Sequence, residues 1–313
     1  MKTSTNKILI TGATGFLGQH LEDELRDSGY KNIEGISSNI CDLRIQEDVN
    51  NYIFTSNPNI VIHCAATVGG IGANRNNPGQ FCYENLIMGA NLIEACRKYC
   101  EDIKKFVLIG TVCSYGKYTP IPFKEDSLFD GYPEETNAYY GIAKSALMVL
   151  LQSYRKQYDF PGITLLPVNM YGTGDSLNIK TNHVIPAMII KFLKAKHNNL
   201  PEVILWGTGN PTREFLYVND CAKAICLAME RYDDEKPVNI GTGKEIKMRD
   251  LAELIAQKIE YEGKITWDYV NPDGQPRRCL DVSRAKEFGF EATTSLNDGL
   301  DKTIEWIRNE IKI

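Results

Sequence analysis

Tyr140 and Lys144 lie four residues apart in the segment TNAYYGIAKSALM. If this segment is a helix, the two side chains project from the same face. An ammonium group close to a phenol favours the phenolate, so the tyrosine can exchange a proton nearer neutral pH. The pair therefore predicts acid catalysis at a carbonyl oxygen. Since the same spacing arises by chance in many amphipathic helices, the prediction depends on the rest of the chain.

A glycine-rich turn lies upstream of this pair. Gly12, Gly15 and Gly18 form the pattern G-x-x-G-x-x-G between the strand-like run KILIT and an amphipathic stretch that begins at Phe16. Glycines let the backbone approach a pyrophosphate, and the N-terminus of the following helix supplies N–H donors and a partial positive charge. The turn therefore predicts a dinucleotide site at the first strand–helix junction.

The segment GISSNICDL (35–43) bears on the choice of dinucleotide. An acidic residue at the end of the second strand usually binds the ribose hydroxyls of NAD, whereas a basic residue accepts the 2′-phosphate of NADP. Ser37, Ser38 and Asn39 provide neither, although they can donate hydrogen bonds to a phosphate. Asp42 and Leu43 can cover the adenine, or Asp42 can be an ordinary solvated carboxylate. The residues favour NADPH only mildly and leave NADH open.

Strands and helices alternate along the first half of the chain, which is typical of a parallel sheet built from βαβ units. We expect strands at 7–11, 32–36, 57–66, 104–115 and 162–172. We expect helices after Phe16, at 84–100 and at 136–158, the last with Asn137 as a candidate N-cap. The predicted fold class is α/β, a Rossmann-type doubly wound parallel sheet with a smaller C-terminal α/β substrate domain.

The pattern changes after about residue 170. A loop leads into a helix within 173–195, two short strands and a helix follow within 202–230, and a loop and strand occupy 232–245. Further helices are expected at 248–262 and 295–311, on either side of a turn-rich segment. We therefore expect a dinucleotide-binding domain over 1–170, also taking in about 214–240, and a nucleotide-sugar substrate domain over 171–313.

Composition excludes several classes of protein. The 313 residues are 43% hydrophobic and 24% charged, with a net charge of −5, so no basic footprint indicates nucleic acid. The start of the chain lacks the pattern of a signal peptide, and no apolar run approaches the ~20 residues that span a bilayer. Nine scattered cysteines without a CxxC pair argue against a metal site and indicate free thiols in the cytoplasm.

Longer motifs carry a resemblance to a known family. Thr111 lies at the end of the fourth predicted strand, and GATGFLG and Tyr140-x-x-x-Lys144 accompany it. This combination resembles the extended short-chain dehydrogenase/reductases, and within them the GDP-L-fucose synthases. The matching stretches are HCAATVGGIGANRNNP (63–78), GTVCSY (110–115), PVNMYG (167–172), NHVIPAMIIKF (182–192), WGTGNPTREFLYVND (206–220) and PDGQPRRCLDVSRAKEFGF (272–290).

The resemblance implies a GDP-4-keto-6-deoxy-hexose that is epimerised at C3 and C5 and then reduced at C4 by NADPH. Tyr140 would donate a proton to the 4-keto oxygen, and Lys144 would hold the nicotinamide ribose and depress the tyrosine pKa. Thr111, where the family more often has serine, would hydrogen-bond the same oxygen. Cys113 and His183 match the epimerisation pair. Read from the residues alone, Cys113 can equally be a buried strand residue and His183 a helix-start cap.

The resemblance also implies two sets of binding residues and a homodimer. The cofactor set is Gly12, Thr14, Gly15, Phe16, Leu17, Gly18, Ser38, Asp42, Leu43, Ala65, Ala66, Tyr140, Lys144, Pro167, Asn169, Met170 and His183. The substrate set is Cys113, Asn169, His183, Lys191, Trp206, Arg213 and Arg278. Arginine forks suit phosphate and tryptophan offers a stacking surface, although each alone is more often a surface charge or a core aromatic.

Three other functions remain compatible with these residues. The first is a C4-reductase that acts on a related GDP-4-keto-sugar, such as a GDP-4-keto-heptose, without epimerising it. The second is a nucleotide-sugar 4-epimerase with tightly bound NAD. The third is a redox sensor or scaffold that binds nucleotide without turnover, and the complete set of Thr111, Tyr140 and Lys144 argues against it.

Overall fold

The computed structural model describes residues 6–178, 183–270 and 273–312. Every predicted site residue falls within these ranges. The predicted loop residues 179–182, which include Asn182 of one motif, and Pro272 of another lie outside the described residues.

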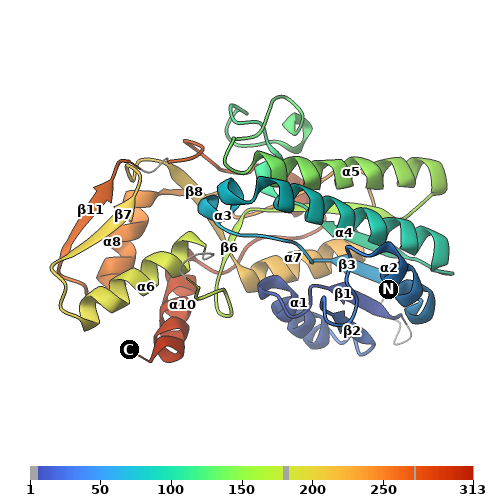
Figure 1. Ribbon diagram of the computed structural model, residues 1–313, viewed down its shortest axis with the longest axis horizontal. Coiled ribbons are helices and arrows are strands. Elements are labelled where there is room, and N and C mark those ends of the chain that lie inside the picture. The colour runs from blue at the N-terminus through green and yellow to red at the C-terminus, as the bar shows by residue number, and fades with distance from the viewer. Residues whose placement is uncertain (1–5, 179–182, 271–272, 313) are drawn as a thin grey trace.

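A six-stranded parallel sheet forms the centre of the larger unit (Figure 1). Its strand order is β2-β1-β3-β4-β5-β9. Most of these strands are buried along their whole length, as expected where helices cover both faces of a parallel sheet. The strands are β1 (Ile8–Thr11), β2 (Ile33–Ile36), β3 (Ile60–His63), β4 (Lys105–Ile109), β5 (Gly162–Pro167) and β9 (Val238–Ile240).

Helices lie on both faces of this sheet (Figure 1). One layer contains α2 (Gln46–Ser56), α4 (Pro78–Tyr99) and α5 (Ala138–Tyr158), and the short α3 (Ile71–Asn76) precedes α4. The other layer contains α1 (Phe16–Asp27) and α7 (Val218–Arg231), which pack against each other. The predicted fold class, a doubly wound parallel sheet, is therefore confirmed.

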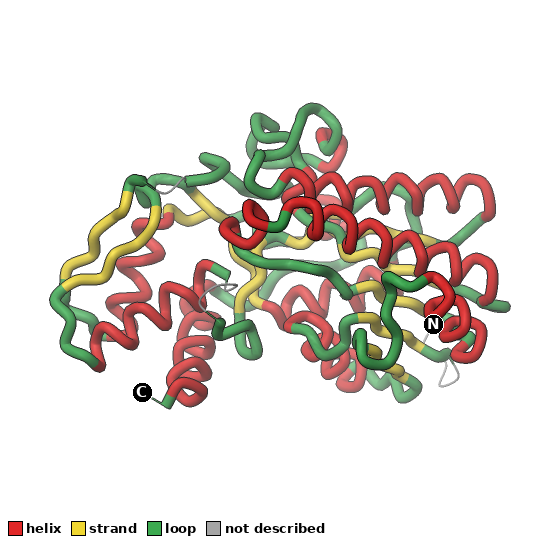
Figure 2. Tube along the Cα trace, viewed as in Figure 1, coloured by secondary structure: helices red, strands yellow, loops and turns green. Residues whose placement is uncertain are grey.

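The smaller unit has two further sheets and a hydrophobic core of its own (Figure 2). Its core gathers apolar side chains such as Ile189, Phe192 and Ile255. Its strands are β6 (Asn169–Tyr171), β8 (Thr212–Tyr217) and β10 (Glu245–Lys247) in one sheet, and β7 (Glu202–Trp206) and β11 (Lys264–Asp268) in the other. Its helices are α6 (Val184–His197), α8 (Met248–Ile259) and α10 (Leu296–Ile311).

The chain passes between the two units more than once. After β8, the segment that forms α7 and β9 returns to the larger unit, where β9 pairs with β5. The short α9 (Ser283–Glu287) also packs on β9. The domain boundary near residue 170 stays a prediction.

Several predicted elements differ from the observed ones. The strand expected at 162–172 is two strands in two sheets, because the chain leaves the larger sheet after Pro167 and β6 pairs with β8. The helix expected at 84–100 begins at Pro78, since proline suits the first turn of a helix. Neither α2 nor β11 was predicted, because the polar run before the third strand and the short run after residue 263 carry weak periodic signals.

Two local features near the site also differ from expectation. The strand expected at 104–115 ends at Ile109, and Val112–Ser114 forms a 3₁₀ turn. Asn137 does occupy the N-cap position of α5, but its side chain makes no capping hydrogen bond. The start of α5 is therefore fixed by other contacts, of which the close packing against the 3₁₀ turn is one.

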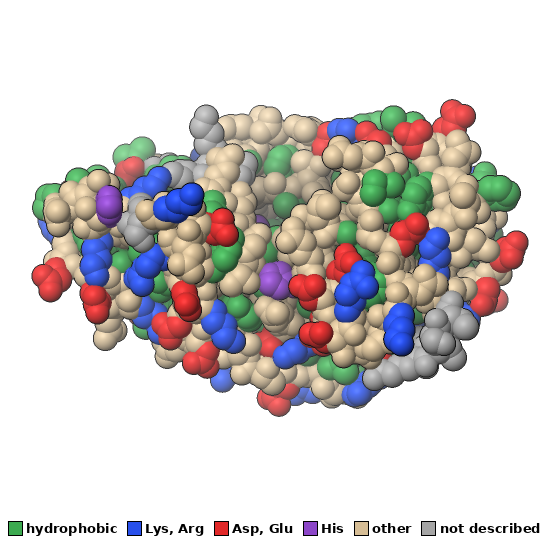
Figure 3. Space-filling model, turned by 90° about the horizontal axis from the view of Figure 1, so that it is seen from below, with side chains coloured by type: hydrophobic (Ala, Val, Ile, Leu, Met, Phe, Trp, Pro, Cys, Tyr) green, Lys and Arg blue, Asp and Glu red, His purple; other side chains and the backbone are tan. Residues whose placement is uncertain are grey.

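The surface carries both signs of charge. On the face drawn in Figure 3, lysine and arginine side chains are interspersed with aspartate and glutamate over both units. Among the described helices, none combines the length and apolarity needed to span a bilayer.

Candidate active site

The glycine turn after β1 lies directly against the segment that follows β3. Gly12 has a φ of 71°, and a Cβ added to it would lie 2.7 Å from the backbone N and Cα of Ala65. Gly15 at the N-cap of α1 makes no side-chain cap hydrogen bond, and the first turn of α1 carries no acidic residue. The backbone N–H groups at the start of α1 suit a phosphate, so these residues fit a dinucleotide.

The strand order places this turn where ligands bind in doubly wound sheets. From β1 the chain adds β2 on one side and then β3 on the other, so the strand order reverses between β1 and β3. A crevice forms outside the carboxyl ends of the strands at such a point. The predicted cofactor residues Gly12 to Gly18 follow β1, and Ala65 and Ala66 follow β3. Pro167 ends β5, which lies two strands further along.

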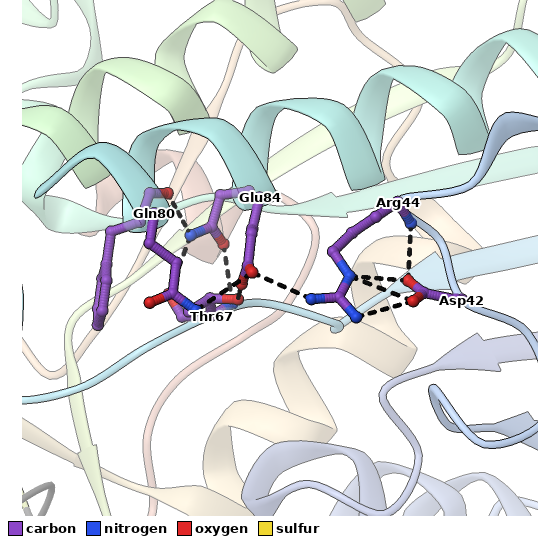
Figure 4. Close-up of polar contacts among 7 residues, drawn as sticks. Asp42, Arg44, Thr67, Gln80 and Glu84 are labelled. Atoms are coloured by element: carbon purple, nitrogen blue, oxygen red, sulfur yellow. Dashed lines mark hydrogen bonds and ion pairs between the residues drawn. The ribbon is translucent and has the colours of Figure 1, made fainter. Parts of the chain in front are cut away.

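A polar network lies where the adenosine half of a dinucleotide is expected (Figure 4). Asp42 accepts a forked interaction from Arg44, with Nη2–Oδ2 at 2.7 Å and Nε–Oδ1 at 2.9 Å. Arg44 Nη1 also contacts Glu84 Oε1 at 3.1 Å, and Glu84 Oε2 accepts from Thr67 at 2.6 Å. The Arg44 guanidinium lowers the pKa of Asp42. Asp42 is thus ion-paired, and the network joins the segment after β2 to α4.

The neighbouring predicted cofactor residues have different environments. Leu43 is buried and its carbonyl accepts from Asn91 Nδ2 at 3.0 Å. Ser38 is exposed and lies in a turn. The backbone N–H groups of Ile40 and Cys41 both donate to the Ser37 carbonyl in this turn. Sequence reasoning missed Arg44, Glu84 and Thr67; the Asp42-x-Arg44 spacing was the only local signal for them.

Tyr140 and Thr111 are brought together by α5 and the turn after β4. The Thr111 hydroxyl lies near the Tyr140 phenol and accepts from the backbone N–H of Cys113 at 3.2 Å. Burial raises the pKa of Tyr140, Cys113 adds to the effect, and the Thr111 hydrogen bond offsets part of it. The phenol therefore stays protonated at neutral pH, which suits a proton donor.

The predicted effect of Lys144 on the tyrosine is wrong in this structure. Lys144 is buried, and its ammonium donates to the carbonyl of Ile109 at 3.0 Å. Burial lowers the pKa of Lys144 to about 8, with Cys64 acting weakly in the opposite direction. Desolvation thus dominates both groups, and the pKa of Tyr140 is raised where we expected it to be depressed.

Gly141 allows α5 to approach the 3₁₀ turn closely enough for these contacts. A Cβ at Gly141 would overlap the Cys113 carbonyl oxygen and would lie 2.8 Å from its carbonyl carbon. The Ser114 hydroxyl donates to the Gly141 carbonyl at 3.0 Å, which joins the two segments. The absent side chain of Gly141 is therefore part of how Tyr140 reaches Thr111.

Gly141→Ala should destabilise the protein by about 1–3 kcal/mol, because the new methyl group meets backbone atoms that cannot rotate away. Gly79→Ala is the matched control, since Gly79 lies in α4 with open space around it, and it should be neutral or slightly stabilising. Urea unfolding of both variants measures the difference. Equal midpoints for the two would show that the α5 contact tolerates a side chain.

Cys113 lies beside two arginines. Its Sγ is 3.7 Å from Nη1 of Arg278, which is buried and otherwise contacts Gln275. Arg213 lies close to Arg278. Burial, and then the charge of Arg278, lower the pKa of Arg213 to about 10. Within the described residues, neither guanidinium has an ion pair with a carboxylate. Two close, unpaired cations of this kind suit a diphosphate.

His183 lines a separate part of the site. It is the N-cap residue of α6, and its Nδ1 lies 3.0 Å from both carboxylate oxygens of Asp175. Phe16 packs against the imidazole with ring centroids 6.5 Å apart. The cavity here measures about 300 Å³ and is lined by Phe16, Val68, Gly69, Gly174, Asp175, Ser176 and His183. Sequence reasoning missed Asp175.

The remaining predicted substrate residues lie in the smaller unit. Lys191 donates to the Ile204 carbonyl at 3.0 Å and its ammonium lies 6.0 Å from the ring of Trp206. Trp206 is exposed, so its face is available to a planar group. Asn169 begins β6 and donates to the Glu214 carbonyl of β8 at 2.9 Å, and Met170 follows it.

The structure therefore groups the predicted residues into clusters. Thr111, Tyr140 and Cys113 form one with Arg278 and Arg213, while His183 pairs with Asp175, and Lys191 with Trp206. No contact among the described residues joins Cys113 directly to His183.

Comparisons with known proteins identify the family. The model of the "NAD dependent epimerase/dehydratase family" matches residues 8–241. A putative GDP-L-fucose synthase 2 of Arabidopsis thaliana is 38% identical, covering 98% of this chain and 93% of the relative. GDP-L-fucose synthase of Escherichia coli K12 is 34% identical, covering 97% of each.

A solved structure is similar over nearly the whole chain. It is a GDP-mannoheptose C4 reductase from Campylobacter jejuni with NADP bound, with a TM-score of 0.89 and 26% identity, covering 98% of this chain and 100% of that one. Both of these curated relatives span almost the full length of the chain. The chain therefore belongs to the NAD-dependent epimerase/dehydratase family of extended short-chain dehydrogenase/reductases.

Proposed function

We propose that the protein is an NADPH-dependent epimerase/reductase that converts a GDP-4-keto-6-deoxy-hexose to GDP-L-fucose. The single observation that carries this proposal is the position of Cys113, beside Arg278 and in the same cluster as Tyr140. A reductase alone needs only the proton donor, whereas epimerisation needs a base near the carbons next to the ketone. The nearly full-length similarity to GDP-L-fucose synthases supports the same substrate.

Epimerisation at C3 and C5 uses the acidity of protons next to a ketone. Removal of such a proton leaves an enolate, whose negative oxygen the hydroxyls of Tyr140 and Thr111 stabilise. We propose that Cys113 removes the proton, since its Sγ lies in this cluster, 3.7 Å from the Arg278 guanidinium. A second group on the opposite face, for which we propose His183, exchanges a proton with the same carbon and so inverts the centre.

Reduction then takes place at C4. NADPH, when bound, supplies the hydride for the ketone carbon. The phenol of Tyr140 gives its proton to the ketone oxygen, and its raised pKa keeps that proton available at neutral pH. Lys144 sits one helical turn further along α5 and is proposed to hold the ribose next to the reactive ring.

NADPH is the proposed reductant, with NADH as the second choice. The solved relative from Campylobacter jejuni binds NADP. In this chain the segment after β2 offers Ser37, Ser38 and Asn39, which are neutral, and the nearby Arg44 is already held by Asp42 and Glu84. Recognition of a 2′-phosphate would therefore depend on hydroxyl and backbone donors, so we expect a modest preference over NADH.

The GDP portion is proposed to lie along the smaller unit. Arg213 and Arg278 would bind the diphosphate, since both are unpaired with carboxylates among the described residues. Trp206 would stack on the guanine, with Lys191 beside it. Asn169 is proposed to contact the sugar or the nicotinamide from the start of β6.

The test of this function uses GDP-4-keto-6-deoxymannose and NADPH in deuterated water. The proposal requires GDP-L-fucose as the product, with solvent deuterium at C3 and C5 by NMR and one NADPH consumed per sugar. A product without deuterium at these carbons would favour the second candidate, a C4-reductase of a related GDP-4-keto-sugar such as a heptose, which the Campylobacter structure supports. Turnover without consumption of added NADPH would instead indicate a 4-epimerase with tightly bound NAD.

We also propose that the protein is a homodimer. Exposed apolar side chains gather on the outer faces of the adjacent helices α4 and α5, namely Tyr83, Leu86, Tyr139, Ile142 and Val149. Monomeric proteins seldom leave such a group uncovered. The expected molar mass by light scattering is twice the chain mass of 35.2 kDa.

Leu86→Lys combined with Val149→Lys should lower this mass to that of the monomer, because the interface would have to bury ammonium groups without partners. Leu200→Lys, at an exposed apolar residue outside α4 and α5, is the control and should leave the mass unchanged. A monomeric wild-type protein would end this proposal.

The compartment is proposed to be the cytoplasm, since all nine cysteines are free thiols.

A further inference from the structure

A buried carboxylate lies behind His183. Asp175 belongs to the loop between β6 and α6, and its side chain is only 2% exposed. Both of its oxygens lie 3.0 Å from Nδ1 of His183, and Oδ1 also accepts the backbone N–H of Ser176 at 2.7 Å. Within the described residues, no lysine or arginine forms an ion pair with this carboxylate.

This geometry selects one tautomer of the imidazole. A carboxylate only accepts hydrogen bonds, so Nδ1 must carry the proton that it donates to Asp175. Nε2 is then the nitrogen that remains for other partners. The ring is 40% exposed, lines the 300 Å³ cavity and is held on one side by Phe16. The pair therefore presents Nε2 as the reactive nitrogen of His183.

Charge balance favours the protonated ring. A buried carboxylate is costly unless a cation or several donors compensate it. Among the described residues, His183 is the only side chain that can supply a positive charge to Asp175 through an ion pair. Burial opposes the imidazolium, but the hydrogen bond and the charge of Asp175 outweigh burial and raise the pKa of His183.

Apart from His183 and Asp175, the described residues that line this cavity carry no charge. Phe16 of α1, Val68 and Gly69 of the segment after β3, and Gly174 carry no ionisable group. Another titratable side chain on these elements is His20 of α1, which packs edge-on against Phe16 and hydrogen-bonds the Thr173 carbonyl at 2.8 Å. Asp175 is therefore the side chain that governs the charge of His183 within the described part of the cavity.

We propose that Asp175 is a positioning residue of the epimerisation site, holding His183 with Nδ1 protonated and Nε2 turned to the sugar. The inference rests on the proposed function, in which Nε2 exchanges a proton with a carbon next to the ketone. The electron pair of the broken C–H bond becomes the enolate, and it forms the new C–H bond when the proton is returned on the opposite face. Asp175 itself exchanges no proton with the substrate.

The first experiment needs no substrate. The protein labelled with ¹⁵N-histidine has four imidazoles, from His20, His63, His183 and His197, and His183→Gln identifies the signal of His183. The wild-type protein should show His183 protonated at Nδ1 in its neutral form. In Asp175→Asn its titration should move to lower pH, while Asp27→Asn, at an exposed aspartate of α1, should leave it unchanged.

The second experiment follows solvent exchange at C3 and C5 in GDP-4-keto-6-deoxymannose. Asp175→Asn should slow exchange by about 10- to 100-fold, a part of the ~10²–10⁴ that a positioned acid or base contributes. The limb of the pH profile that belongs to His183 should move to lower pH, because the imidazolium loses its stabilising charge. Asp175→Glu should restore part of the rate.

The outcomes separate the inference from the function on which it rests. If His183 of the wild-type protein carries its proton on Nε2, or titrates identically in Asp175→Asn, the positioning role is wrong whatever the enzyme does. If the tautomer and titration are as expected but the wild-type protein exchanges no deuterium, the proposed function fails and the pair is only structural. Should Asp175→Asn not fold, the wild-type tautomer alone still decides.

Discussion

Tyr140→Phe should slow turnover of the GDP-4-keto-sugar by about 10²- to 10⁴-fold, the range for loss of a positioned proton donor. The phenol lies near the Thr111 hydroxyl, and burial raises its pKa, so it carries the proton that the C4 oxygen must receive. Phenylalanine keeps the ring and removes only the hydroxyl. The affinity for NADPH, measured by fluorescence titration, should therefore stay nearly unchanged.

Tyr139→Phe is the matched control for this effect. Tyr139 is the preceding residue of α5, but its side chain is half exposed and lies on a different face of the helix. Turnover of Tyr139→Phe should match that of the wild-type protein. If Tyr140→Phe also turns over at the wild-type rate, the proton must come from another group and the phenol has no part in the reaction.

The features that the sequence predicted well are those encoded within a few residues. The spacing of Tyr140 and Lys144 places both on α5, and the glycine pattern places the phosphate turn between β1 and α1. Short, continuous apolar runs predicted five strands of the larger sheet, because parallel strands are buried on both faces. These signals depend on local geometry and so survive without any tertiary information.

The features that it missed depend on contacts between distant segments. Arg278 reaches Cys113 across 165 residues, and no pattern in either segment indicates the other. Asp175 is close to His183 in sequence, but a loop aspartate is ordinarily solvated, and only its burial shows that it holds the imidazole. The direction of the Tyr140 pKa was wrong for the same reason, because desolvation is a property of the folded site.

Cys113→Ala should slow solvent exchange at C3 and C5 by about 10²- to 10⁴-fold, because it removes the proposed base. Reduction of the C4 ketone should persist in part, since Tyr140 and Thr111 remain in place. The measurement is deuterium exchange into GDP-4-keto-6-deoxymannose, compared with NADPH consumption by the same preparation. The two rates must separate if Cys113 acts only in epimerisation.

Loss of the thiol should have little effect on the fold. Cys113 is only half buried, and the buried Arg278 keeps its contacts with Gln275 when the sulfur is removed. Cys82→Ala, at a half-buried cysteine of α4, is the control and should leave both rates unchanged. An equal fall of exchange and reduction in Cys113→Ala, with an unchanged unfolding midpoint, would contradict a separate base. Cys113 would then serve the Tyr140 cluster by packing, and the base would have to be sought elsewhere, with His183 as the first residue to substitute.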